Sequence, residues 1–165
     1  INTVAYYRGG ETTSTNVALS KLGLDEIRRW ILLMMAKDFN KGKSDEIIKM
    51  ALIRARFAEK IAKETSLSDR YYEAFMMGMF SLIDLIVEAE ISEVLKDLPL
   101  DYEVKAAILG EQNMFGEILE FVKAYEDGQW EKICNKQDGF YLDVNTATNY
   151  YFECLVYADE IFRNM

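Results

Sequence analysis

The stretch Ser68-Asp-Arg-Tyr-Tyr-Glu-Ala-Phe-Met-Met-Gly-Met-Phe-Ser-Leu-Ile-Asp-Leu-Ile-Val-Glu88 decides the fold. Its apolar side chains recur at three- and four-residue steps, which predicts one helix over residues 68–88. Ala74, Gly78 and Ser81 follow one another at i, i+4 and i+7. We therefore expect a row of small residues along which another helix packs closely.

Asp84 is the exception in this helix, because residues 76–87 are otherwise apolar or small. A carboxylate on such a face needs a partner when it is buried. We expect a structural Asp84 that is paired with Arg28 or Arg29 of an earlier helix, since buried charges are usually paired. A functional role for Asp84 is the second interpretation.

Helical periodicity also dominates the rest of the chain. The pattern predicts further helices over residues 15–22, 26–37, 45–64, 92–98, 101–109, 115–125, 130–136 and 143–162. The segment from Trp30 to Ala36 is apolar nearly all round, which is typical of a helix buried in a bundle. No segment alternates as a strand does, and Pro99 is the only proline. We predict an all-α fold, with residues 1–165 forming a single compact domain of eight or nine helices.

The composition excludes several classes of protein. The chain has no histidine, which rules out metal sites built on imidazole and nucleophiles activated by histidine. Cys134 and Cys154 are too few for a disulfide framework, so we expect a cytoplasmic setting, with Cys154 in the core. No apolar run reaches the roughly 20 residues that span a bilayer, and no signal-peptide pattern is present.

Charge is unevenly distributed along the chain. Residues 1–70 carry 13 Lys+Arg against 9 Asp+Glu, a net charge of +4, whereas residues 71–165 carry 6 against 19, a net charge of −13. The total of −9 argues against nucleic-acid binding, which needs a basic surface. The asymmetry favours head-to-tail contact between copies or docking to a neighbouring domain. The plainer explanation is that both halves of the chain simply present charged faces to solvent.

Two groups of charged residues are candidate sites. Four arginines on two predicted helices are candidates for binding an anion or phosphate: Arg28, Arg29, Arg54 and Arg56. The carboxylates of Glu88, Glu90 and Glu93 lie close together in sequence. They lack the Glu-x-x-His pairs of helical di-metal sites, so we do not predict such a site there.

Several stretches resemble, in the same order, those of HDOD domains. They are Asn16-Val-Ala-Leu-Ser-Lys-Leu-Gly23, Glu26-Ile-Arg-Arg-Trp30, Ala51-Leu-Ile-Arg-Ala-Arg-Phe-Ala-Glu59, Gly78-Met-Phe-Ser-Leu-Ile-Asp84, Glu93-Val-Leu-Lys-Asp-Leu-Pro-Leu100 and Tyr125-Glu-Asp-Gly-Gln-Trp130. The set spans most of the chain and is most similar to the C-terminal domain of YuxH-like EAL-plus-HDOD signalling proteins. HDOD domains in turn resemble degenerate HD and HD-GYP phosphohydrolases.

The resemblance implies an all-helical, HD-like domain of bacterial signal transduction. It also implies an N-terminal EAL neighbour, which in active members hydrolyses cyclic di-GMP. Residues 1–165 would then lack the first HDOD helices as well as that EAL domain. Within the chain, we expect Arg28, Arg29, Trp30 and Asp84 to serve structure or interaction.

The chain departs from the catalytic HD pattern at one decisive position. In catalytic HD enzymes a His-Asp doublet that follows a helical glycine holds the metal. The aligned position here is Ser81-Leu82, and neither side chain can replace those ligands. We therefore predict no catalytic residue, no metal and no cofactor.

The leading hypothesis is a non-catalytic signalling module that regulates or scaffolds a cyclic di-GMP phosphodiesterase (EAL) neighbour or a protein partner through its helix faces. A homodimer is compatible with this hypothesis. One alternative is a receptor that binds a nucleotide or other phosphate ligand in an arginine-lined cleft. The other is a divergent metal-dependent phosphohydrolase, in which Asp84 and Glu88 hold a hard cation such as Mg²⁺.

Overall fold

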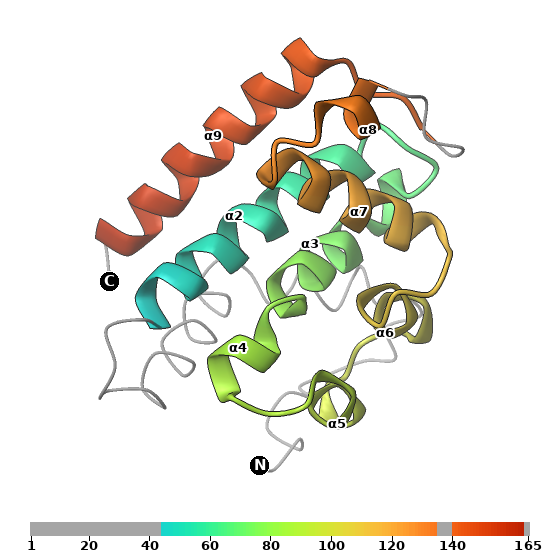
Figure 1. Cartoon of the computed structure of the whole chain (residues 1–165), viewed down its shortest axis with the longest axis vertical. Coiled ribbons are helices and arrows are strands. Elements are labelled where there is room, and N and C mark those ends of the chain that lie inside the picture. The colour runs from blue at the N-terminus through green and yellow to red at the C-terminus, as the bar shows by residue number, and fades with distance from the viewer. Residues whose placement is uncertain (1–43, 135–139, 164–165) are drawn as a thin grey trace, which may run out of the picture.

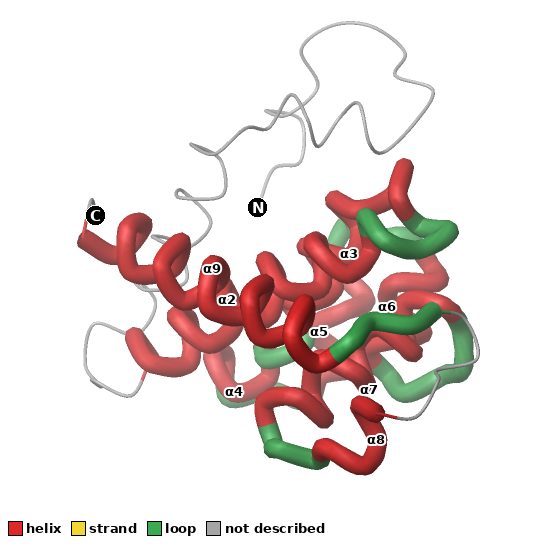
Figure 2. The backbone as a smooth tube through the Cα atoms, turned by 90° about the horizontal axis from the view of Figure 1, so that it is seen from above, coloured by secondary structure: helices red, strands yellow, loops and turns green. Residues whose placement is uncertain are grey.

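Helices are the only regular secondary structure in residues 44–134 and 140–163, which are the residues that the computed structural model describes (Figure 2). The elements are α2 (Ser44–Ala62), the 3₁₀ helix η2 (Ser68–Arg70), α3 (Tyr71–Phe80), α4 (Ile83–Val87), α5 (Ile91–Asp97), α6 (Tyr102–Ile108), α7 (Met114–Glu126), α8 (Trp130–Cys134) and α9 (Val144–Arg163). The all-α prediction is confirmed. The predicted helices over residues 15–22 and 26–37, with Arg28, Arg29 and Trp30, lie outside the described residues.

Helix α2 is the central element of the fold, in contact with α3, α4, α7 and α9. In Figure 1, α9 runs along one side of α2, and α3 lies on the other side. Helix α6 packs against α3 and α7, and α5 packs against α4. The inner side of α2 is completely buried, through Ile48, Ala51, Leu52, Ala55, Phe57, Ala58, Ile61 and Ala62.

The closest approach between α2 and α3 is at Gly78. A Cβ atom built on Gly78 would lie 2.5 Å from the Cα atom of Ala55 and 2.7 Å from its backbone nitrogen, which is closer than real contacts allow. Ala74, one turn earlier on the same face, is fully buried. The predicted row of small residues is therefore confirmed, and it lets the two backbones touch.

The predicted single helix over residues 68–88 is wrong in one respect, because the structure breaks it at Ser81 and Leu82. The Ser81 hydroxyl donates a hydrogen bond of 2.8 Å to the carbonyl oxygen of Gly78, in competition with the helical backbone. Leu82 leaves helical geometry, at φ −122° and ψ 15°. The chain resumes as α4 and ends that helix at Glu88, whose φ of 52° is left-handed.

Side-chain caps fix the starts of three later helices. Asp101 accepts a hydrogen bond from the Glu103 backbone nitrogen at 3.0 Å, and Asn113 accepts one from Gly116 at 2.9 Å. Asp143 accepts bonds from Asn145 and Thr146 at the start of α9, and the hydrogen bond from the Thr146 hydroxyl lowers the pKa of Asp143. These caps orient α6, α7 and α9.

Gly78→Ala tests the close approach of α2 and α3. We expect the variant to lose about 1–3 kcal/mol of unfolding free energy, because the added methyl group displaces a backbone. Urea unfolding monitored by circular dichroism measures this loss. Combining Gly78→Ala with Ala55→Gly should not restore stability, since the crowded atoms of Ala55 belong to its backbone. A gain in stability, as the higher helix propensity of alanine gives at uncrowded positions, would contradict the close approach.

Candidate functional site

Ser81, the first of the two residues that the family resemblance aligns with the HD doublet, is hydrogen-bonded to an arginine from α2. The Nη1 atom of Arg54 donates to the Ser81 hydroxyl oxygen at 3.0 Å, and that hydroxyl donates onward to Gly78. Arg54 lies on the buried side of α2, with 8% of its side chain exposed. A guanidinium group therefore lies directly beside the position aligned with the HD doublet.

A carboxylate from α7 neutralises this buried guanidinium. The Nε and Nη2 atoms of Arg54 donate to Glu126 Oε2 at 3.0 and 2.5 Å, and Nε also lies 3.2 Å from Oε1. Only 5% of the Glu126 side chain is exposed. Two nitrogens of the guanidinium thus donate to one ionised carboxylate, and charge-assisted hydrogen bonds of this kind are stronger than those between neutral groups. It joins α2, the end of α7 and the α3–α4 break into one hydrogen-bonded unit, which we call the Arg54–Glu126–Ser81 cluster.

The Arg54–Glu126–Ser81 cluster does not fit a metal ion. Arginine offers only donors and a fixed positive charge, so it repels a cation instead of ligating it. Glu126 is already bound to Arg54, and Leu82 is partly buried against the core with no ligand atom. Among the described residues, no group of three or more His, Cys, Asp or Glu side chains is placed to hold a metal ion.

Aromatic rings connect α2, α7 and α9 next to the cluster. Phe57, fully buried on α2, meets the rings of Tyr125 and Tyr151 edge-on, each at 5.3 Å between centroids. Burial, reinforced by the charge of Glu126, raises the pKa of Tyr151. The Tyr125 hydroxyl donates to the hydroxyl of Thr148 at 3.1 Å. These contacts fix α9 to the end of α7 that carries Glu126.

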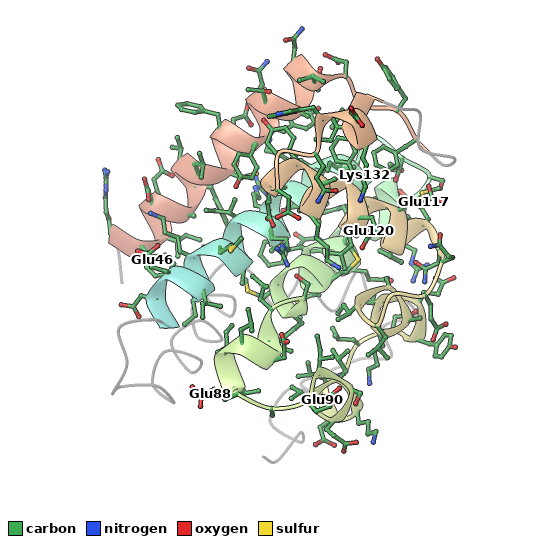
Figure 3. All side chains as sticks on the ribbon, in the orientation of Figure 1. Glu46, Glu88, Glu90, Glu117, Glu120 and Lys132 are labelled. Atoms are coloured by element: carbon green, nitrogen blue, oxygen red, sulfur yellow. The ribbon has the colours of Figure 1, made fainter. Side chains whose placement is uncertain are left out.

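The remaining predicted acidic residues do not converge on one site. Asp84 is partly buried, and no described residue forms a hydrogen bond or ion pair with it. Its predicted partners, Arg28 and Arg29, lie outside the described residues, so the pairing stays a prediction. Figure 3 shows Glu88 and Glu90 near the turn between α4 and α5, whereas Glu117 and Glu120 lie on α7. The alternative of a cation held by Asp84 and Glu88 gains no support from this arrangement.

Lysines on the outer edge of α2 pair with acidic residues of α9. Lys49 Nζ lies 2.5 Å from Asp159 Oδ1, and Lys60 Nζ lies 2.5 Å from Glu153 Oε2. The hydrogen bond between Lys49 and Asp159 raises the pKa of the lysine and lowers that of the aspartate. Basic residues from the first part of the chain, on α2, therefore contact acidic residues from its second part, on α9, within one molecule.

Tyrosines of α9 strengthen the same contact. The Arg56 guanidinium lies over the ring of Tyr157, 4.9 Å from its centroid, which is a cation–π distance. The Tyr150 hydroxyl donates to Glu64 at 2.8 Å. Arg56 also binds Glu59 at 2.5 Å, so both described arginines of the predicted anion cleft are already paired. Arg54 and Arg56 do not form that cleft, and Arg28 and Arg29 lie outside the described residues.

Comparison with known proteins identifies the family of this chain. Residues 1–116 match the HDOD domain family. This chain belongs to the HDOD domain family. Arg54 and Ser81 lie within this matched range, whereas Glu126 lies ten residues beyond it.

Two relatives extend the comparison. The chain is 40% identical over 151 residues to "Uncharacterized protein YuxH" of Bacillus subtilis (strain 168), and this match covers 90% of the chain and 36% of the relative. It is 28% identical over 133 residues to "Cyclic di-GMP phosphodiesterase CdgJ" of Vibrio cholerae serotype O1 (strain ATCC 39315 / El Tor Inaba N16961), covering 81% of the chain and 31% of that protein. The HDOD chain thus spans about a third of the length of these relatives. No solved structure matches it significantly.

Sequence reasoning missed Glu126 and gave Arg54 a different role. Both residues carry a signal in their spacing. Arg54 follows the buried Ala51 by three residues and precedes the buried Ala58 by four, and Glu126 follows the buried Val122 by four. A charged residue on the buried face of each of two helices, with opposite signs, predicts a buried ion pair. Cys154, in contrast, was predicted correctly, because it is fully buried and burial raises the pKa of its thiol to about 12.

Among the described helices of this HDOD domain, none is both long and apolar enough to cross a membrane.

A double-mutant cycle tests the buried ion pair. We expect Arg54→Met to lose roughly 3–5 kcal/mol of unfolding free energy, because it leaves the Glu126 carboxylate buried without a partner. Arg54→Met combined with Glu126→Leu should recover most of that loss, since no charge then remains buried. Urea unfolding of the parent, Arg54→Met, Glu126→Leu and the double variant completes the cycle and measures these differences.

Arg56→Met is the matched control for this cycle. It should lose less than about 1 kcal/mol, because Lys63 still pairs with Glu59 at 2.7 Å when Arg56 is gone. Equal losses for Arg54→Met and Arg56→Met, or a double variant no more stable than Arg54→Met, would contradict the role given to the pair.

Proposed function

We propose that this HDOD domain is a non-catalytic module of cytoplasmic cyclic di-GMP signalling, which regulates or scaffolds a phosphodiesterase of the EAL type or another protein partner. The observation that carries the proposal is the Arg54–Glu126–Ser81 cluster. This chain has an arginine beside Ser81, the residue that the family resemblance aligns with the metal-binding doublet of the HD phosphohydrolases. This replacement supports a domain that acts by contact and not by hydrolysis.

The signalling context rests on the relatives. One of them is named as a cyclic di-GMP phosphodiesterase, and the HDOD chain covers only 31% of it. The catalytic part of such a protein would then lie in the other two thirds. We infer the same division for this chain, with an EAL domain outside residues 1–165.

The helix faces supply the means of contact. Helices α4 and α6 expose apolar or aromatic side chains to solvent, among them Leu85 and Tyr102. A partner that docks on exposed helix faces can bias a neighbouring domain without any chemistry in this one.

Restoring the doublet tests whether the cluster excludes a metal. Ser81→His with Leu82→Asp should bind Mn²⁺ weakly, because the Arg54 guanidinium lies 3.0 Å from the Ser81 hydroxyl position and repels a cation. Adding Arg54→Ala removes that charge and releases Glu126 as a ligand, so we expect the Mn²⁺ affinity to rise at least about tenfold. Isothermal titration calorimetry measures both, with circular dichroism to verify the fold. Equal affinities in the two variants would contradict the exclusion.

Hydrolysis of cyclic di-GMP tests the regulatory role directly. The longer protein that contains this chain would be assayed intact and with residues 1–165 deleted, at equal concentrations of folded enzyme. We expect the deletion to change the hydrolysis rate, because the domain biases its catalytic neighbour. Cyclic di-GMP binding by the deleted form, measured by calorimetry, verifies that the remaining enzyme is folded.

Two outcomes of this assay would overturn the proposal. One is a rate that is nonzero and the same with and without residues 1–165, which would remove regulation in cis. The other is hydrolysis of cyclic di-GMP by residues 1–165 alone, which would make the domain itself the enzyme.

A further inference from the structure

The outer face of α9 carries an exposed apolar centre. Phe152 is 66% exposed and Val156 is 43% exposed, and Leu155 beside them is 37% exposed. The opposite face of the same helix is buried through Ala147, Cys154, Ala158 and Ile161. Exposed apolar side chains that gather on one face, instead of being scattered singly, mark an interaction surface.

The outer face of α9 follows a heptad pattern. Asn145, Asn149, Phe152, Val156, Asp159 and Arg163 succeed one another at alternating steps of four and three residues. This is the a/d spacing that places side chains along the seam between two paired helices. Phe152 and Val156 occupy the middle of this seam, and polar residues occupy both ends. We call these six residues the outer α9 stripe.

The order of the polar residues selects one occupant and one orientation. In an antiparallel pair with a second copy, centred between Phe152 and Val156, each Phe152 faces the partner's Val156. The uncharged amides of the first turns then face the charged residues of the last turns: Asn149 faces the partner's Asp159, and Asn145 faces the partner's Arg163. An amide donates to a carboxylate and accepts from a guanidinium, so both end pairs are complementary.

A parallel pair lacks this complementarity, because it places Asp159 on Asp159 and Arg163 on Arg163. Self-repulsion is also low at this face, although the chain carries a net charge of −9. Asp159 is neutralised by Lys49, and Glu153, at the edge of the stripe, is neutralised by Lys60.

We propose that two copies of this chain pair through the outer α9 stripe as an antiparallel, two-fold symmetric dimer. Such an isologous contact closes on itself and leaves no unpaired stripe. One 20-residue helix per copy, roughly 30 Å long, makes an interface at the small end of the known range, so the dimer depends on concentration. The dimer is independent of the signalling role proposed above.

Sedimentation velocity of the full chain over a range of concentrations measures the association. We expect a monomer–dimer equilibrium, weakened at least about tenfold by Phe152→Glu with Val156→Glu, because carboxylates then face each other in the seam. Leu85→Glu on α4 is the matched control: Leu85 is 54% exposed and lies outside the stripe, so this variant should associate as the parent does. Circular dichroism verifies that each variant is folded.

Disulfide trapping tests the antiparallel register. In a Cys134→Ser background, the chain with both Asn145→Cys and Arg163→Cys should form covalent dimers on mild oxidation. Each variant with only one of the two introduced cysteines should form no covalent dimer, because its two copies lie at opposite ends of the pair and the remaining Cys154 is fully buried. The two positions are about 27 Å apart within one helix, which prevents a disulfide within the chain.

Three results would overturn the proposal. The first is a chain that stays monomeric at the highest concentration studied. The second is a dimer whose affinity is the same in the Phe152→Glu, Val156→Glu variant as in the Leu85→Glu control. The third is efficient disulfide trapping of the variants that carry only one introduced cysteine, which indicates a parallel pair.

Discussion

The buried positive charge of Arg54 is the constraint on which the rest of the structure depends. A guanidinium with 8% of its side chain exposed has to be matched by a carboxylate and by acceptors for its other hydrogens. Glu126 meets the first need, and it ties the end of α7 to α2. Ser81 meets the second, and its own bond to Gly78 accompanies the interruption between α3 and α4. The connection between three separate helices therefore follows from one residue.

Helix α2 satisfies its charges in two different environments. On its inner side, the charge of Arg54 is neutralised by Glu126 away from solvent, where loss of either partner lowers the stability of the fold strongly. On its outer edge, Lys49 and Lys60 meet α9 in contact with solvent, where each ion pair contributes little and is screened by salt. The aromatic contacts of Phe57 with Tyr125 and Tyr151 supply the apolar part of the attachment of α9. The charge asymmetry along the sequence is thus used for internal packing, at least between these two helices.

Features that depend on neighbours in sequence could be predicted, and features that depend on distant partners could not. The spacing of Ala74 and Gly78 predicts the seam with α2, and the helices predicted to start at residues 101 and 143 begin at the aspartates that cap them, because these are local effects. The break at Ser81 was missed because its hydroxyl is held by Arg54, 27 residues away. Glu126, 72 residues from Arg54, escaped for the same reason. The family resemblance aligns Ser81 with the HD doublet, but residue types alone do not reveal that the Arg54 guanidinium lies beside it in space.

The buried pair also has a consequence for how this domain can evolve. Replacing Arg54 alone leaves a carboxylate buried without a partner, and replacing Glu126 alone leaves a guanidinium buried without one, so each single substitution destabilises the fold. The two positions can therefore change together at little cost, but either one changes alone only by way of a less stable chain. Selection for stability alone is therefore sufficient to keep both residues in place, whatever the domain does.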